Sequence, residues 1–125
     1  MNRAAMIAFF CAGGGLTRYY LSGWVYALFG RSFPYGTLVV NIIGAYLIGL
    51  IMELALRSTV LSDTMRLALT VGFLGGLTTF STFSYETFQL LEDGQFVVAA
   101  INVLVSVFVC LLCTWLGIVT IRALS

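Results

Sequence analysis

The chemistry of this chain is concentrated in the segment 75–84, which reads Gly-Gly-Leu-Thr-Thr-Phe-Ser-Thr-Phe-Ser. The segment stands inside an apolar stretch long enough to cross a membrane, where lipid offers no hydrogen bonds. The adjacent Gly75 and Gly76 weaken a helix, and a break there releases backbone carbonyls that bind hard cations well. We therefore expect a helix broken near Gly75–Thr79, buried in protein or lining a polar path.

Phe80 and Phe83 are three residues apart and share a helix face after this break. An aromatic ring has a positive edge and a negative face, so ring edges can line a path for an anion while offering little to a cation. Core packing or contact with lipid is the alternative for both rings. Glu86 follows on much the same side, and an acid within a span is a functional candidate unless it simply reaches water. Hydroxyl donors stand beside the rings at Ser81, Thr82 and Ser84.

The other apolar stretches also carry polar side chains. Thr37 and Asn41 are four residues apart and share a helix face, as lining or as interhelical hydrogen bonds. Arg18 either draws anions into a vestibule or extends its charge to the interface. Tyr26 follows as part of an expected interfacial aromatic belt. A polar stripe at four-residue spacing in the last stretch favours a lining: Asn102, Ser106, Cys110 and Thr114.

Cys110 and Cys113 form a CxxC pair, a spacing that occurs in metal and redox sites. The chain has 3 Cys and no His, so nothing completes such a site. Cysteine is also a common small packing residue in apolar surroundings. We interpret both thiols as packing groups.

Composition sets the class of protein. The 125 residues are 61% hydrophobic and 9% charged, whereas a typical soluble domain is about 25% charged. We therefore predict an all-α integral membrane protein with a single domain, 1–125, and about four spans of roughly 20 residues. We expect no cleavable signal peptide, and the net charge of +1 gives no basic face for nucleic acid. The expected spans are Ala4–Leu28, Gly36–Leu56, Met65–Leu91 and Phe96–Ile121.

Arginine placement gives a weak preference for orientation. With four spans both termini lie on one side, and that side carries more arginines, which favours the cytoplasm. A chain this short cannot hold two inverted repeats, so if the working unit needs two-fold symmetry, that symmetry must come from a dimer. The arginines of the terminal side are Arg3, Arg57, Arg66 and Arg122.

Together these motifs resemble the small bacterial fluoride channels of the Fluc (CrcB) family along essentially the whole chain. The resemblance is carried by Gly13-Gly14-Gly15 with Arg18-Tyr19, then by Gly36–Asn41, and by Gly75–Ser84 with Glu86. It implies an antiparallel, dual-topology homodimer with two pores in the bacterial plasma (inner) membrane. The implied activity is passive export of fluoride, with no enzymatic step.

The resemblance also implies residue roles. Phe80 and Phe83 match the paired pore phenylalanines, Asn41 matches the pore asparagine, and Arg18 matches a vestibule arginine. The remaining residues assigned to the fluoride path are Ser81, Thr82, Ser106 and Glu86.

A sodium ion is implied as well. Gly75 and Thr78 match the positions whose backbone carbonyls hold a structural Na⁺ at the dimer interface. The chain departs from the family pattern at Asn102, where many relatives have tyrosine, so its role is open. The arginine bias also favours one orientation, whereas the dual topology implied by the resemblance requires insertion in both.

Two other classes of protein compete with a channel. A proton-coupled multidrug exporter needs a carboxylate deep in a span, whereas Glu53 and Glu86 lie near span ends. A scaffold that transports nothing would use its polar stripes as interhelical hydrogen bonds. No nucleotide motif is present, and an enzyme is unsupported because no nucleophile stands with a base.

Overall fold

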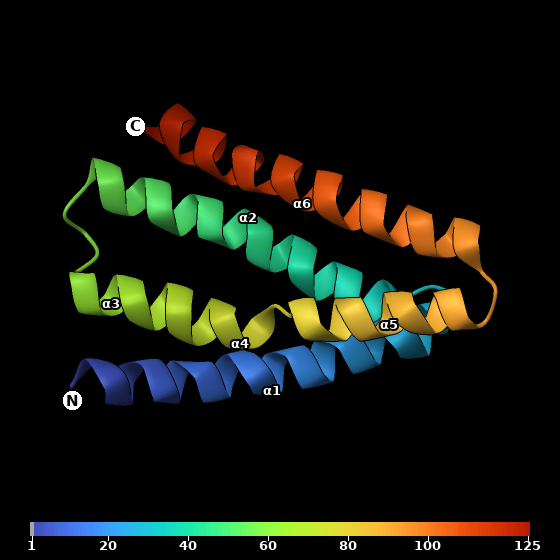
Figure 1. Ribbon diagram of the computed structural model, residues 1–125. Coiled ribbons are helices and arrows are strands. Elements are labelled where there is room, and N and C mark those ends of the chain that lie inside the picture. The colour runs from blue at the N-terminus through green and yellow to red at the C-terminus, as the bar shows by residue number, and fades with distance from the viewer. Residues whose placement is uncertain (1) are drawn as a thin grey trace.

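The computed structural model describes residues 2–125, and every element in that range is helical, which confirms the all-α prediction. Figure 1 shows long helical rods that run across the view side by side, with both termini at the left-hand end. The first, second and last rods are continuous, whereas the third is divided into segments; we call the run from α3 to α5 the third rod. The elements are α1 (Arg3–Phe29), α2 (Tyr35–Arg57), α3 (Asp63–Leu67), η1 (Ala68–Leu74), α4 (Gly75–Leu77), α5 (Phe80–Glu92) and α6 (Phe96–Leu124).

The sequence marks the ends of these helices with capping residues. Asn2 begins α1 by accepting a hydrogen bond from the Ala5 N–H on its side-chain oxygen (2.8 Å), and Ser62 caps α3 in the same manner. Gly30 ends α1 at φ 82°, and Gly94 turns the chain between α5 and α6 at φ 76°. Both angles are left-handed, which glycine adopts without strain.

Close packing of α1 against the third rod depends on small residues. A Cβ added to Gly14 would lie 1.9 Å from the Phe73 carbonyl oxygen, and one added to Gly76 would lie 2.5 Å from that of Cys11. The two backbones therefore touch, which is how helices associate where lipid gives no hydrophobic drive. The last rod, α6, packs mainly against α2. The bundle consequently has two tightly packed pairs of rods.

Three helical rods are long and apolar enough to cross a membrane: α2, the third rod over Asp63–Glu92, and α6. The expected spans in these regions lie inside the observed helices. α1 has 27 residues, about 40 Å at the helical rise, which exceeds a hydrocarbon core of about 30 Å. α1 is long enough to span but is not among the three rods that are also apolar enough, so a fourth span remains a prediction.

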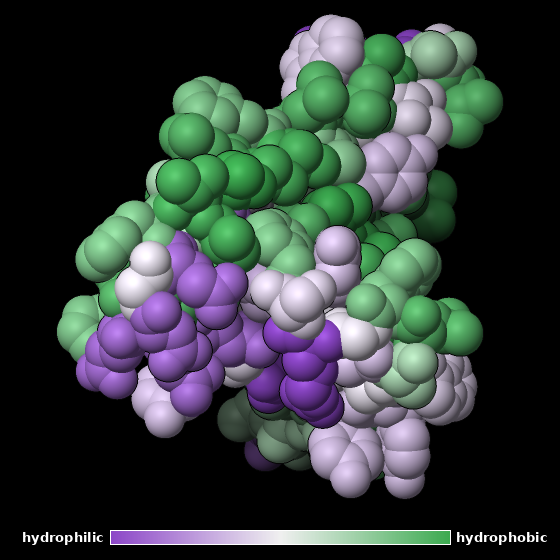
Figure 2. All heavy atoms as spheres, turned by 90° about the vertical axis from the view of Figure 1, so that its right-hand side faces the viewer, coloured by the Kyte–Doolittle hydropathy of each residue, from purple (hydrophilic) through white to green (hydrophobic). Residues whose placement is uncertain are grey.

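The end of the bundle opposite the termini is polar. Figure 2 looks onto this end, where hydrophilic residues gather in the middle and lower part beside apolar flanks. A hollow here is lined by Arg31, Glu92 and Asp93, among others. We call it the outer hollow. Charged groups thus collect where the rods meet water.

Candidate ion pathway

The third rod is broken at Thr78 and Thr79. Their backbones are extended, with φ −90° and ψ 158° at Thr78 and φ −152° and ψ 117° at Thr79. The break predicted near Gly75–Thr79 is confirmed. The expectation that Gly75 and Gly76 make the break is wrong, because both are helical residues of α4. The seven residues before them, η1, form a π-helix, a wide coil that often occurs near functional sites and that the sequence did not indicate.

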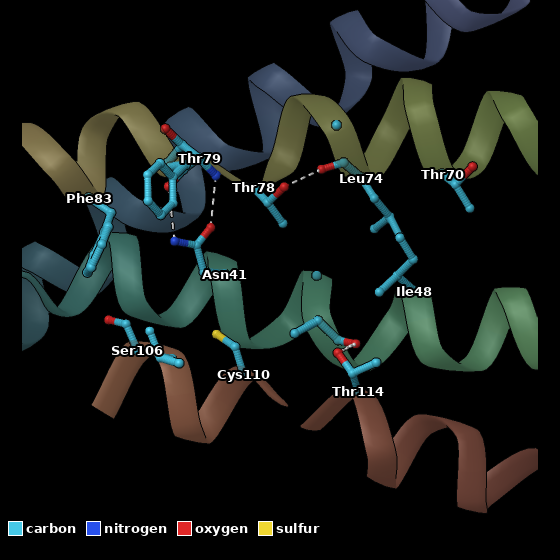
Figure 3. A pocket seen from close by; sticks show the side chains of 15 residues that line it. Asn41, Ile48, Thr70, Leu74, Thr78, Thr79, Phe83, Ser106, Cys110 and Thr114 are labelled. Atoms are coloured by element: carbon cyan, nitrogen blue, oxygen red, sulfur yellow. Dashed lines mark hydrogen bonds between the residues drawn. The ribbon is translucent and has the colours of Figure 1, made fainter. Parts of the chain in front are cut away.

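Asn41 in α2 stabilises the break. Its side-chain nitrogen donates to the Thr79 carbonyl at 3.1 Å, and its side-chain oxygen accepts from the Thr79 N–H at 2.8 Å (Figure 3). The Thr79 hydroxyl in turn accepts from the Thr82 N–H at 3.1 Å and so caps α5. These bonds replace partners that neither lipid nor helix supplies at this point.

The break leaves several backbone carbonyls of the third rod without their helical donors, those of Gly75 and Thr78 among them. In a continuous α-helix the Thr79 N–H would donate to the Gly75 carbonyl and the Thr82 N–H to the Thr78 carbonyl. Here these two N–H groups donate to the side chains of Asn41 and Thr79 instead. The Gly75 and Thr78 carbonyls are therefore two of the groups that can accept another partner.

Arg18 lies beside the same break. Its Nε donates to the Gly76 carbonyl at 2.9 Å, and the side chain is half-buried between α1 and the third rod. The guanidinium therefore turns toward the protein rather than extending along α1 to the interface. It also satisfies a carbonyl that the break would otherwise leave exposed.

An elongated groove of about 440 Å³ runs beside the break, lined by residues of α2, the third rod and α6 (Figure 3). Phe80 and Phe83 both line it, with ring centroids 5.4 Å apart and ring planes inclined by 45°. Phe83 is buried at 9% exposure, whereas Phe80 is 78% exposed at the open side. Of the polar residues predicted for the path, Asn41 and Ser106 line the groove. Further hydroxyl groups in its lining come from Thr70, Thr78, Thr79 and Thr114.

The other predicted path residues lie away from this groove. Thr82 and Glu86 line a separate hollow between α5 and the first two helices, which we call the inner hollow. Ser81 is exposed, with its hydroxyl 3.3 Å from that of Thr79. Glu86 accepts a hydrogen bond from the Tyr26 hydroxyl at 2.7 Å and another from the Thr37 hydroxyl. The predicted site residues are thus divided between two regions around α5.

The polar stripe of α6 is also divided. Ser106, Cys110 and Thr114 line the groove. Asn102 is 1% exposed and donates from its side-chain nitrogen to the Thr87 hydroxyl at 2.8 Å, while accepting from the Ser106 hydroxyl at 3.4 Å. Asn102 therefore joins α6 to α5 and supports Ser106 from behind.

Tyr26 has a contact that the sequence did not indicate. It lines the outer hollow at the polar end of the bundle, where an interfacial belt is expected, and its hydroxyl also donates to Glu86 in α5. The spacing of Arg18, Ser22 and Tyr26, each four residues after the last, could have revealed an inward polar stripe on α1.

Comparisons with known proteins find similarity to one family over nearly the whole chain. A model of the family described as CrcB-like protein, Camphor Resistance (CrcB), matches residues 5–118. A protein of Trichlorobacter lovleyi named fluoride-specific ion channel FluC is 80% identical over 125 residues, which is 100% of both chains. A protein of Pelobacter propionicus with the same name is 73% identical over 124 residues, 99% of this chain and 96% of that one. A third, from Geobacter metallireducens, is 69% identical over 118 residues, 94% and 95% of the two chains.

The family match spans nearly all of α1 to α6, including the broken third rod and the helices that line the groove. The relatives also agree with this chain from end to end, so no part of the bundle stands outside the comparison. This chain therefore belongs to the CrcB family.

Proposed function

We propose that this chain forms a fluoride-selective channel that lets cytoplasmic fluoride leave the cell passively. The similar proteins of Trichlorobacter lovleyi and Pelobacter propionicus carry the name of such a channel. The chain is a multi-pass integral membrane protein of a bacterial family whose place is the inner membrane. The observation that carries the proposal is the interrupted third rod, which brings two phenyl rings and an amide together at one groove.

Fluoride is small and strongly hydrated, so a pore must replace its water with other donors. In this proposal Asn41 donates the second N–H of its amide, and the Ser106 hydroxyl turns from its 3.4 Å bond to Asn102 to donate beside the rings of Phe80 and Phe83. Ring edges are weakly positive and attract an anion without binding it tightly. Ser81 and Thr82 extend the donor set along α5.

Transport is expected to run outward without an energy source. The sequence contains no nucleotide motif and no repeat of a coupled carrier. A membrane potential that is negative inside favours exit of one negative charge by about 2.3 kcal/mol per 100 mV. This corresponds to roughly a fiftyfold lower internal concentration at equilibrium, since about 1.4 kcal/mol is tenfold.

The working unit in this proposal is an antiparallel homodimer with two pores. The groove is open along one side, and Phe80 presents most of its ring there. A second copy that covers the groove would close each path, and a two-fold axis would place the same surface on both partners. One chain alone offers only part of a pore wall.

A structural sodium ion fits the same interface. The Gly75 and Thr78 carbonyls have lost their helical donors, and carbonyl oxygens are the ligands that hard cations prefer. Gly75 and Thr78 both line the groove that the partner would cover. The ion would add positive charge beside the two anion paths.

The proposal is tested by anion efflux from proteoliposomes of purified protein, followed with fluoride and chloride electrodes while valinomycin balances the charge. We expect rapid loss of fluoride and chloride loss no faster than from protein-free vesicles. Equal efflux of both ions would reject fluoride selectivity. Absence of any efflux would favour a scaffold, and proton release on addition of a cationic drug would favour an exporter.

A further inference from the structure

We propose that Tyr26 is a positioning residue for fluoride conduction, which acts by holding the carboxylate of Glu86 in place. This inference rests on the proposed channel function and extends it to a residue that no motif of the sequence singled out. The Tyr26 side chain has three contacts. Its hydroxyl bonds to Glu86, one face of its ring lies against Arg31, and the ring packs against the backbone of α2 at Gly36.

The carboxylate of Glu86 has one donor for each oxygen. The Tyr26 hydroxyl donates to Oε2 at 2.7 Å, and the Thr37 hydroxyl donates to Oε1. The two hydroxyls lie 3.4 Å apart, so the three groups form a compact cluster from α1, α2 and α5. Over residues 2–125 the ion pairs all involve Glu53, so the direct donors to the Glu86 carboxylate are these two hydroxyls, with the Arg31 cation on the far side of the Tyr26 contact. Hydrogen bonds to an ionised group are about twice as strong as neutral ones.

The Tyr26 ring is itself held from two directions. The Arg31 guanidinium carbon lies 4.3 Å from the ring centroid, which is a cation–π contact. At the other contact the backbone of α2 comes so near that a Cβ on Gly36 would lie 2.4 Å from a ring carbon. The hydroxyl therefore has little freedom and fixes the carboxylate with it.

The cluster stands at the boundary between the two polar hollows. Tyr26, Arg31 and Glu86 line both the outer hollow at the polar end of the bundle and the inner hollow beside Thr82. In the proposed channel an anion that moves between the outer and the inner hollow goes by Glu86, because Glu86 lines both. Held by two hydroxyls, the carboxylate keeps a fixed place; released from Tyr26, it can rotate about its side-chain bonds and bring negative charge toward Thr82.

The test removes this one donor and keeps the ring. We expect Tyr26→Phe to lower the initial rate of fluoride efflux from proteoliposomes roughly tenfold, the effect of losing one charge-assisted hydrogen bond. Tyr46→Phe is the matched control, because it removes a hydroxyl that lies 3.1 Å from Thr120, away from both hollows. We expect Tyr46→Phe to conduct like the wild type, and both variants to elute as dimers on size exclusion.

A second measurement separates positioning from packing. The carboxylate stretching band of Glu86, assigned by its loss in Glu86→Gln, should shift in the infrared spectrum of Tyr26→Phe and stay in place in Tyr46→Phe. Adding Tyr26→Phe to Glu86→Gln should slow efflux no further. An unshifted band would overturn the inference, as would wild-type efflux in Tyr26→Phe or an additional tenfold loss in the double variant.

The outcomes also distinguish this inference from the proposed function. A wild-type protein that passes no fluoride would reject the channel, whatever the spectra show. A conducting wild type with equally fast Tyr26→Phe would leave the channel standing and reject the role of Tyr26.

Discussion

At the scale of single residues, Asn41 matters most because one amide supplies both a donor and an acceptor to the broken backbone. A hydrocarbon side chain of similar size fills the same space and satisfies neither the Thr79 N–H nor its carbonyl. A buried backbone group without a partner costs about 1 to 3 kcal/mol. The break in the third rod therefore depends on a side chain from another helix.

We expect Asn41→Leu to lower the melting temperature of the detergent-solubilised protein and to abolish fluoride efflux, because both Thr79 groups lose their partners. Scanning fluorimetry and electrode recordings measure the two effects. Tyr46→Phe, on the same helix, serves as the control and should melt close to the wild type. An Asn41→Leu protein that melts and conducts like the wild type would show that the amide does not support the break.

Residue spacing predicted several residues of the groove, but it did not predict that the site residues would be divided between the groove and the inner hollow. Phe80, Phe83, Asn41 and Ser106 do meet at one groove, since spacing along a helix tells which residues share a face. Spacing does not tell which neighbouring helix covers that face. Packing of α1 and α2 decides it, and so Glu86 meets Tyr26 rather than the phenyl rings.

At the scale of the elements, the third rod uses glycine for close packing against α1 and threonine for the break itself. Because glycine weakens helices in general, the adjacent Gly75 and Gly76 led to the prediction of a break near Gly75–Thr79. The structure uses Gly76 for backbone contact with α1, while Thr79, with its capping hydroxyl, takes the extended conformation. Helix boundaries were predicted well because caps and polar turns are local signals. The π-helix η1 was not, because it depends on how the rods pack.

We expect Gly14→Ala to destabilise the bundle, because its Cβ would collide with the Phe73 carbonyl and push α1 from the third rod. Overpacking of this kind costs about 1 to 3 kcal/mol. Gly23→Ala on the same helix meets nothing within 4 Å and should be neutral or slightly stabilising. Melting curves in detergent compare the two. Equal melting temperatures for both variants would contradict the close contact between α1 and the third rod.

At the scale of the whole molecule, one chain presents an open groove and carries arginines mainly at the end with the termini. Two of these, Arg57 and Arg122, contact the buried carboxylate of Glu53 at 2.8 and 3.0 Å. This carboxylate offsets part of the positive charge at that end. The open groove, and the Gly75 and Thr78 carbonyls whose helical donors bond elsewhere, are the features on which the proposal of a homodimer rests.

We expect fluoride efflux to stop when sodium is replaced on both sides of the membrane by a large organic cation, because the Gly75 and Thr78 carbonyls would lose their ligand. Returning sodium should restore efflux. The electrode assay measures both steps, with protein-free vesicles as the blank. Efflux that continues unchanged without sodium would reject the cation site and leave the anion path unaffected.

The most direct test of the account is fluoride efflux from proteoliposomes of Phe80→Ile, compared with the wild type and with Phe88→Ile. Phe88 lies on the same helix, is 60% exposed and does not line the groove, so its variant should conduct normally. We predict that Phe80→Ile still forms dimers but passes no fluoride, since the ring edge beside the broken helix is gone. Normal fluoride efflux through Phe80→Ile would contradict the proposed path.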